Sequence, residues 1–178
     1  MFRKNIFNVL ELNQLQIYSL QEVKNYLRIT HDYDDATIKS LIGSAIDSAE
    51  NFLGLSLHER KIEFTCNIVG KRVFPLKVEP VVGIEEITFY EAKQSRQLAK
   101  DEYYFDAEYC TLYLKQALSG EELKVIFITG FAKRGLPDAI RQGIMLHICA
   151  MYDRDSDSSL TLSTEIKNLY YPYKRMRL

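Results

Sequence analysis

The stretch over residues 34–53 constrains the fold more than any other part of the chain. Its apolar residues recur with the spacing of one broad buried face on a helix, and they are Ile38, Leu41, Ile42, Ala45, Ile46, Ala49, Phe52 and Leu53. Asp34 stands where it can cap the first turn, and Gly54 follows where a left-handed cap is favoured. A helix of this length spans roughly 30 Å. The stretch therefore predicts a long amphipathic helix that other elements must cover.

The composition is that of a globular protein with balanced charge. The chain has 178 residues, 47% hydrophobic and 26% charged, and its formal net charge is -1. A chain of this size can bury a real core as a single domain. Proteins that grip DNA tightly are much more basic, because their affinity comes from neutralising phosphates. The charge argues against a dedicated DNA binder, although DNA can still slide past such a surface.

The cysteines and the N-terminal residues bear on where the protein works. Cys66, Cys110 and Cys149 are widely spaced and odd in number, and no CxxC pair of a zinc site occurs. We interpret them as small buried hydrophobes, two in strands and one on a helix, which suits a reducing cytoplasm. Polar residues interrupt the apolar N-terminal region, and no apolar run is long enough for a membrane. We therefore expect neither a signal peptide nor a membrane partner.

Two further helices are predicted beside the long one. Ser19 and Glu22 have the spacing of a capping box, which begins a helix over residues 19–28. In this helix Lys24 falls on the polar face. A proline opens the third helix, expected over residues 137–153, in the first turn where proline is tolerated. The inner face of that helix carries Ile140, Ile144, His147, Ile148 and Met151.

Between these helices the apolar pattern changes to the alternation of strands. The expected strands cover residues 62–68, 73–76, 84–90, 103–105, 110–114 and 123–131. The last is apolar on both faces, so we expect it to be the most buried strand. Residues 93–100 are interpreted as a charged loop, and residues 1–18 as an extended arm with room for a short strand or helix.

The order of elements predicts an α+β fold in one domain, residues 1–178. The helices within residues 19–54 and 137–153 should pack as a small helical bundle. An antiparallel β lobe over residues 61–131 is inserted between them. A flexible linker and docking tail follow over residues 155–178.

No strong catalytic or metal-binding pattern stands out. Asp153, Asp155 and Asp157 imitate the start of a calcium loop, but serine and threonine occupy the places of the required glycine and glutamate. Residues 31–35 form a polar cluster of one histidine and three aspartates, and helix capping explains it better than a metal or acid–base site. His147 is interpreted as a core histidine. We therefore expect no catalytic residue, no metal and no cofactor.

Gly43 and Gly143 interrupt predicted helices, where each costs on the order of 1 kcal/mol relative to alanine. Both are either tolerated or needed for a close approach between helices. That approach would be within the fold or between subunits, and the sequence leaves these alternatives open.

The end of the chain is rich in aromatic and basic residues. After a stretch dominated by serine and threonine it carries Leu169, Tyr170, Tyr171, Tyr173, Lys174, Arg175 and Arg177. A short helical turn is expected around residues 165–170, and residues 171–178 are not expected to pack a core by themselves. They form either a disordered end or a docking peptide, because tyrosine and arginine often anchor interfaces and such tails can order on binding.

An ordered set of segments runs through roughly residues 17–178, none of them specific alone. They are SLQEVKNYLR at 19–28, the long helix ending at Gly54, FPL at 74–76, PVVGI at 80–84, ITFY at 87–90, VIFITGF at 125–131, LP at 136–137 and YKR at 173–175. In this ordered set the chain resembles phage head–tail connector (adaptor) proteins, which are also described as phage DNA-packaging or head-completion proteins and include adaptors of gene transfer agents. Leu55 and Lys174 stand where the family often has arginine.

The resemblance implies a structural protein of a tailed phage, a prophage or a gene transfer agent. Such connectors form a dodecameric ring below the portal, extend the DNA channel and offer a platform for the stopper or tail. Their C-terminal segments often dock onto the portal, and the family carries no catalytic activity. The implied partners are the portal protein, a tail or stopper protein, other copies of the chain, and double-stranded DNA that passes without sequence-specific binding.

The implied location is the head–tail junction of the virion, with synthesis in the bacterial host cytoplasm. A closed head-to-tail ring needs two different complementary faces, so a free protomer can stay monomeric until the portal templates the ring. Two alternatives remain. A nucleic-acid-binding DNA-packaging accessory protein predicts a contiguous basic face, and an enzyme predicts chemistry at residues 31–35.

Overall fold

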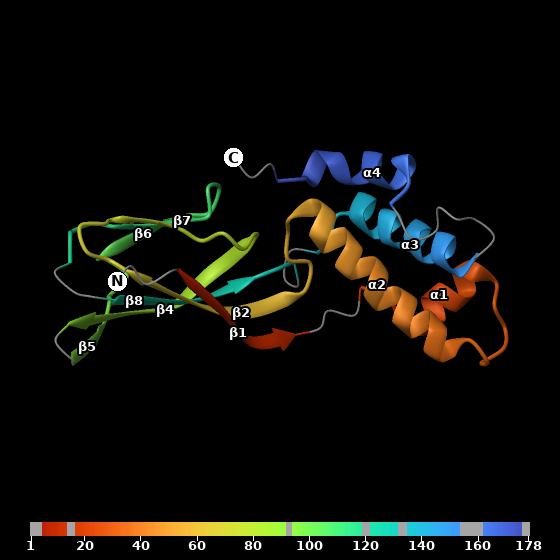
Figure 1. The fold of residues 1–178 in the computed structure, drawn as a ribbon, viewed down its shortest axis with the longest axis horizontal. Coiled ribbons are helices and arrows are strands. Elements are labelled where there is room, and N and C mark those ends of the chain that lie inside the picture. Colours follow the sequence, from red (N-terminus) through yellow and green to blue (C-terminus); the bar gives the residue numbers. More distant parts are fainter. Residues whose placement is uncertain are drawn as a thin grey trace. The chain divides into compact units, whose positions relative to one another are not determined.

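The structure is a computed structural model that describes residues 5–13, 17–91, 94–118, 122–131, 135–153 and 162–175. The chain divides into two compact units. The β unit comprises residues 1–14 and 58–132, and the helical unit comprises residues 15–57 and 133–178. Each unit is therefore built from two separate stretches of chain (Figure 1). The expected α+β class is confirmed.

The β unit consists of two antiparallel sheets. Its strands are β1 Ile6–Asn13, β2 Glu59–Asn67, β3 Val73–Pro75, β4 Val81–Glu91, β5 Gln94–Gln97, β6 Tyr103–Asp106, β7 Thr111–Leu114 and β8 Glu122–Thr129. The five-stranded sheet has the order β1-β2-β8-β4-β5, and the three-stranded sheet has the order β3-β7-β6. Figure 1 shows two layers, with β6 and β7 above β4 and β8.

One face of each sheet enters a shared apolar core. The core combines Ile62, Phe64, Val125 and Phe127 of the larger sheet with Phe74, Leu112 and Leu114 of the smaller one. In β8, burial alternates strictly along the strand, so Ile126 and Ile128 lie outside this core. The strand that was expected to be the most buried therefore places one face in this core and leaves the other face half-buried. β8 is the central strand of its sheet, but only one face of the sheet packs against the other sheet.

Two expectations for the β unit are wrong. Residues 93–100 are not a plain charged loop, because Gln94–Gln97 forms the edge strand β5. All four of its side chains are exposed, so no alternation marked it as a strand. Cys110 is buried as expected, but it lies in the turn before β7 with a φ of 46° rather than in a strand. The N-terminal arm contains β1, which pairs antiparallel with β2.

The helical unit contains α1 Leu20–Leu27, α2 Asp35–Leu53, α3 Asp138–Tyr152, α4 Thr164–Tyr170 and the 3-10 helix η1 Tyr171–Tyr173. Within it, α3 packs between α2 and α4 (Figure 1). The predicted capping box of α1 is confirmed, since the Glu22 N–H donates to Ser19 Oγ and the Ser19 N–H donates to Glu22 Oε2. Gly54 caps α2 in the left-handed conformation as predicted, with a φ of 71°.

The inner faces predicted for α2 and α3 form the core of the helical unit. They include Ile38, Ala45, Ile46, Ala49 and Leu53 of α2 and Ile140, Ile144, His147, Ile148 and Met151 of α3. One position on α1 differs from its prediction. Lys24 was expected on the polar face, but it is only 5% exposed. Within the described ranges, none of the helices has the length and apolar content that a membrane crossing requires.

Candidate functional site

The aromatic and basic residues near the C-terminus do not form one exposed docking peptide. Tyr170 is the last residue of α4 and is completely buried. Its ring packs against Gly143 of α3, where a Cβ would collide with it. The centroid of the Phe52 ring of α2 lies 6.0 Å from that of Tyr170. Tyr170, a member of the predicted docking set, is therefore part of the core of the helical unit.

The chain after α4 is tied to the C-terminal end of α2. The Lys174 ammonium lies 4.3 Å from the centre of the Phe52 ring and 5.9 Å from that of Tyr171. The Arg175 N–H donates to the Leu53 carbonyl at 3.1 Å. A cation over an aromatic face and a backbone hydrogen bond both stabilise such a contact. The end of α2 therefore anchors this segment.

The other residues predicted for docking differ in their exposure. Leu169 is half-buried, whereas Tyr171 and Tyr173 are 56% and 37% exposed. Arg177 lies outside the described residues. Aromatic rings on a surface are frequent anchors of protein interfaces. Tyr171 and Tyr173 are thus the aromatic side chains that this segment can offer to a partner.

Lys24 is the centre of the polar cluster that includes residues 31–35. Its Nζ lies 2.6 Å from Asp32 Oδ1 and 2.7 Å from Asp35 Oδ1. The hydrogen bonds to Asp32 and Asp35 raise the pKa of Lys24, and the bond to Lys24 lowers the pKa of Asp32. Lys24 is therefore protonated at neutral pH and is not poised as a nucleophile or base. The cluster acts as an ion-pair clamp that joins α1 to the start of α2.

The remaining members of the cluster do not assemble a reactive site. His31 Nε2 is 3.9 Å from Asp34 Oδ2, and both side chains are more than one-third exposed. Asp34 is the N-cap residue of α2, as predicted, but its side chain makes no capping hydrogen bond and instead accepts from Tyr152 Oη at 2.7 Å. Across the part of the chain that the structure describes, no group of three or more metal-binding side chains occurs. Asp155 and Asp157 of the calcium-like pattern lie outside that part.

The buried histidine and cysteines have structural positions. His147 is 1% exposed, and neither of its ring nitrogens has a hydrogen-bond partner within the described residues. Burial lowers the pKa of His147, so the ring is neutral in the core. The predicted burial of His147 is confirmed. Burial also raises the pKa of the Cys66 thiol to about 12, which suppresses its reactivity.

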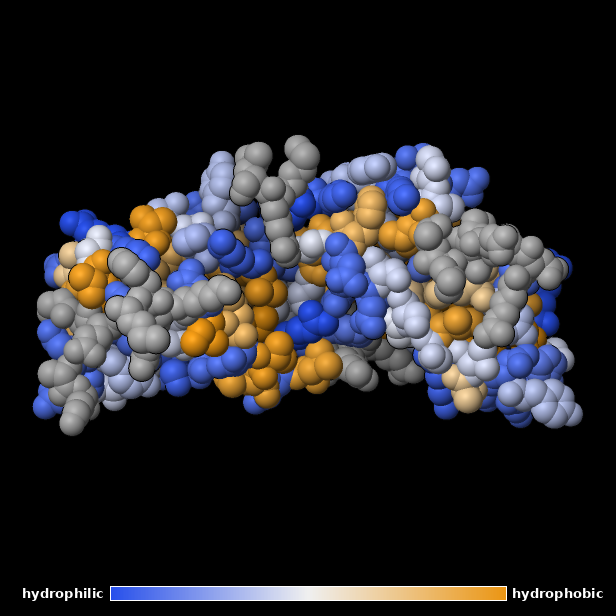
Figure 2. Space-filling view, in the orientation of Figure 1, coloured by the Kyte–Doolittle hydropathy of each residue, from blue (hydrophilic) through white to orange (hydrophobic). Residues whose placement is uncertain are grey.

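Two surfaces of the β unit were not anticipated from the sequence. The edge strand β1 exposes Ile6, Val9, Leu10 and Leu12 by 46% to 59%, and Figure 2 shows apolar residues gathered where β1 lies. On the smaller sheet, the rings of Tyr104 and Tyr113 are exposed with centroids 6.2 Å apart. Sequence alternation marked Tyr104 and Tyr113 only as ordinary strand residues. The signal for β1 was weaker still, because its apolar residues do not alternate regularly.

Comparison with known proteins decides the family. The family model described as head completion protein matches residues 16–168. The chain belongs to the head completion protein family. The match confirms the resemblance found in the sequence, and this head completion protein is a head–tail connector or adaptor of a phage or gene transfer agent particle. A comparison with curated proteins gave no match.

Solved structures with the same fold come from gene transfer agent particles. A chain from the neck of an empty particle, computed with C6 symmetry, has a TM-score of 0.74 at 16% identity, with 97% of each chain covered. A chain from the virion of a native particle gives the same values. A chain from the neck of a native particle, computed with C12 symmetry, has a TM-score of 0.65 at 17% identity and covers 95% of the head completion protein and 97% of itself.

Proposed function

We propose that copies of this head completion protein form a closed ring beneath the portal, at the head–tail junction of the particle. The ring extends the DNA channel and joins the head to a tail or stopper protein, and a dodecamer is the expected size. The observation that carries the proposal is the family match over residues 16–168. The fold shared with chains from neck structures of C6 and C12 symmetry supports it.

The proposed role requires surfaces rather than catalysis. Lys24 is held as an ion pair, which supports a structural reading of the polar cluster. The formal net charge of -1 supports passage of double-stranded DNA without sequence-specific binding, because each neutralised phosphate would add affinity and drag.

Deletion of the gene from the particle that encodes it tests this role. We expect DNA-filled heads and free tails that fail to join, and we expect a plasmid-borne wild-type copy to restore tailed particles. Electron microscopy of the lysate distinguishes heads, tails and joined particles. Tailed, infectious particles produced at the normal level by the deletion strain would contradict the proposal.

We further propose that the exposed rings of Tyr171 and Tyr173 contact the portal protein. Two neighbours from the predicted docking set fix this segment to the helical unit. Tyr170 is buried, and Lys174 lies over the Phe52 ring. Deletion of residues 164–178 would not test this contact cleanly, because it would also remove Tyr170 from the core.

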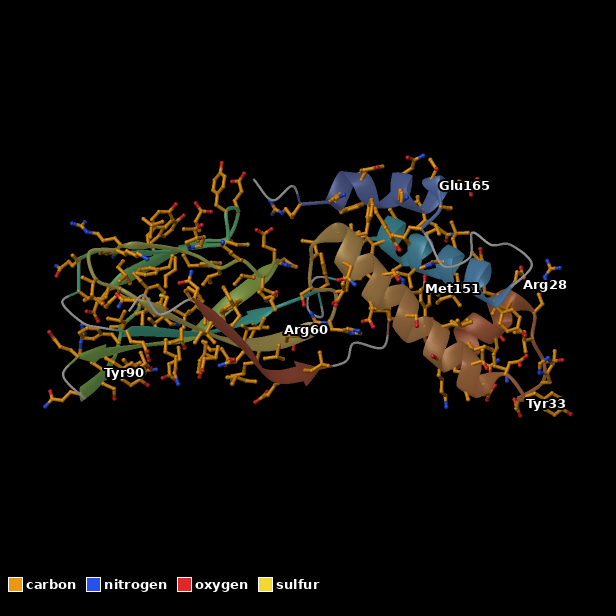
Figure 3. The ribbon with its side chains drawn as sticks, in the orientation of Figure 1. Arg28, Tyr33, Arg60, Tyr90, Met151 and Glu165 are labelled. Atoms are coloured by element: carbon orange, nitrogen blue, oxygen red, sulfur yellow. The ribbon has the colours of Figure 1, made fainter. Side chains whose placement is uncertain are left out.

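Point variants separate docking from folding. The double variant Tyr171→Ala/Tyr173→Ala should reduce co-purification with the portal by at least about tenfold, as expected for two aromatic anchors. The matched control is Tyr33→Ala, since Tyr33 is 92% exposed at the tip of the α1–α2 connection in the same unit, with its ring turned away from the helices (Figure 3). Co-purification unchanged in the double variant, with an unchanged Tm, would reject the docking role.

A further inference from the structure

We propose that the outer faces of the two sheets of the β unit are the two halves of the contact between neighbouring copies. The outer face of the five-stranded sheet of one copy receives the outer face of the three-stranded sheet of the next. This inference rests on the proposed function, because it names the surfaces by which copies would form the ring. The inner faces of both sheets share one core, so the outer faces lie on opposite sides of the unit (Figure 1).

The outer face of the five-stranded sheet is here called the acidic face. Its described charged residues are six glutamates and two lysines, namely Glu11, Glu59, Glu63, Glu85, Glu86, Glu122, Lys61 and Lys124. Lys61 Nζ lies 2.8 Å from Glu85 Oε2. Lys124 Nζ lies 2.9 Å from Glu63 Oε2. Both lysines are thus neutralised locally, and the face keeps a formal excess of four negative charges.

Apolar side chains lie among the charges of the acidic face. Ile126 and Ile128 are half-buried there, and the adjoining edge strand β1 leaves Ile6, Leu10 and Leu12 exposed by 46% to 48%. The face is hollowed by a depression of about 550 Å³, which is lined by Glu11, Leu12, Glu59, Lys61, Glu85 and Ile128. The acidic face therefore offers a hollow in which Leu12 and Ile128 lie among charged side chains that are mostly negative.

The outer face of the three-stranded sheet is here called the aromatic face. Val73, Tyr113 and Tyr104 stand side by side across it, with exposed fractions of 51%, 36% and 59%. Four exposed cations flank β3 and β7, and they are Lys71, Arg72, Lys77 and Lys115. Residues 71–77 and 111–116 contain no carboxylate. The half of the face formed by β3 and β7 therefore offers Val73 and Tyr113 with a positive rim, and Tyr104 of β6 lies beside Tyr113.

The two faces complement each other in both apolar character and charge. Interfaces place aromatic anchors at an apolar centre and charged groups at the rim, and opposite potentials select the partner and its orientation. A ring needs two different faces on each protomer that fit one another. The acidic and aromatic faces meet this requirement. The partner proposed for each face is therefore a second copy of the chain.

The free edge of β1 also favours a second copy of the chain as the partner. Isolated proteins usually protect sheet edges with charge, proline or short length. Among the described edges, β5 is short and wholly polar, and β3 has three residues and ends in Pro75. β1 is eight residues long and exposes apolar side chains. Cover from a neighbouring copy would remove this apolar edge from water.

Charge reversal on each face provides the test. Variant one carries Glu11→Lys and Glu86→Lys on the acidic face, and variant two carries Lys77→Glu and Lys115→Glu beside the aromatic face. Each is supplied from a plasmid to particles that lack the native gene. Lys100→Glu, in an exposed turn outside both faces, is the matched control. The Tm of each purified variant is measured to establish that it folds.

Each reversed variant alone would bring like charges together, so we expect tailed particles to fall by at least about tenfold. Co-expression of the two variants should restore them, because each altered face then meets an oppositely charged face of the other variant. The Lys100→Glu control should behave as wild type. Restoration by mixing is specific to two different faces that contact each other, and a folding defect would not produce it.

Other outcomes overturn the inference in distinguishable ways. Normal particles from either folded variant alone would show that copies meet through other surfaces and would leave the proposed function intact. Loss in both variants without rescue by mixing would show that the faces do not meet. If variant two is not rescued and also loses a gel shift with double-stranded DNA that the wild type shows, the aromatic face binds DNA. Failure of the wild-type plasmid to restore joining would instead reject the proposed function.

Discussion

The ring of Tyr170 occupies the space that a side chain at Gly143 would need. A Cβ at position 143 would lie 2.8 Å from Tyr170 Cζ and 3.0 Å from Tyr170 Oη. Contacts this short do not persist in folded proteins without movement of one partner. Gly143 thus permits the close approach of α3 and α4. Of the alternatives left open for this glycine, the structure supports a close approach between helices within the fold.

Gly143→Ala is therefore expected to destabilise the protein by about 1–3 kcal/mol, the usual range for overpacking a core. Gly43 supplies the opposite case, because nothing lies within 4 Å of the Cβ position there. Gly43→Ala should stabilise α2 by about 0.5–1 kcal/mol through helix propensity. Denaturant unfolding of both variants measures the two signs. Equal effects at the two positions would contradict the packing of Tyr170 on Gly143.

Tyr170 should respond differently to loss of its hydroxyl and loss of its ring. The hydroxyl is buried without a hydrogen-bond partner within the described residues, so Tyr170→Phe should leave stability unchanged or raise it by about 1 kcal/mol. Tyr170→Ala leaves a cavity and should cost about 3–5 kcal/mol. Urea midpoints give both values. A large loss in Tyr170→Phe would mean that the hydroxyl has a partner in solution.

Lys24→Met should lower the Tm at pH 7 by a few degrees. The size of this decrease should depend on pH, because the ion pairs of Lys24 with Asp32 and Asp35 require both partners to be charged. The pKa of Asp32 is lowered below its usual 3.8 by the bond to Lys24, so the contribution is present above pH 3.8 and is lost as pH falls further. The pKa of Lys24 is raised above its usual 10.5, so the contribution is also lost at higher pH.

Thermal unfolding of wild type and Lys24→Met from pH 7 to pH 3 measures this difference. Lys39→Met, on the exposed side of α2, is the matched control and should track the wild type throughout. A difference between wild type and Lys24→Met that stays constant down to pH 3 would show that packing of the lysine stem, rather than its ion pairs, holds the clamp.

His147 should make the protein less stable in mild acid. Burial lowers its pKa below 6.5, so the unfolded chain takes up a proton at a pH where the folded chain does not. Stability is therefore highest above pH 6.5 and falls as pH drops below it. His147→Met keeps an apolar side chain of similar size and should remove this part of the pH dependence, giving a higher Tm than wild type at pH 5.

Scans of Tm from pH 8 to pH 5 compare the two proteins. Parallel curves for wild type and His147→Met would contradict a neutral buried ring at position 147. The comparison is best made in the His31→Gln background, which removes an exposed histidine from both proteins.

The sequence predicted those elements in which a local pattern and a packed face agree. α2 has a long stretch of helical periodicity, Asp34 at its N-cap and Gly54 at its C-cap. Its predicted bounds lie within one residue of the observed helix. The capping box of α1 likewise depends only on two nearby residues. Alternation in β2 was readable because one of its faces enters a core and the other does not.

The failures involve partners that are distant in sequence. Lys24 was assigned to the polar face because helical periodicity does not register Asp32 and Asp35, which reach it from beyond the helix. Tyr170 resembled part of an exposed tail because its composition does not reveal the space left by Gly143. The acidic and aromatic faces also escaped notice, since each gathers residues from several strands.

The division of the chain also sets the order in which its parts can form during synthesis. All eight strands of the β unit have left the peptidyl transferase centre once Thr129 has been added, whereas α3 and α4 have not yet been translated. During synthesis the β unit can therefore fold while α1 and α2 still lack the surfaces that will cover them. The apolar faces of these two helices stay open to water until α3 and α4 emerge.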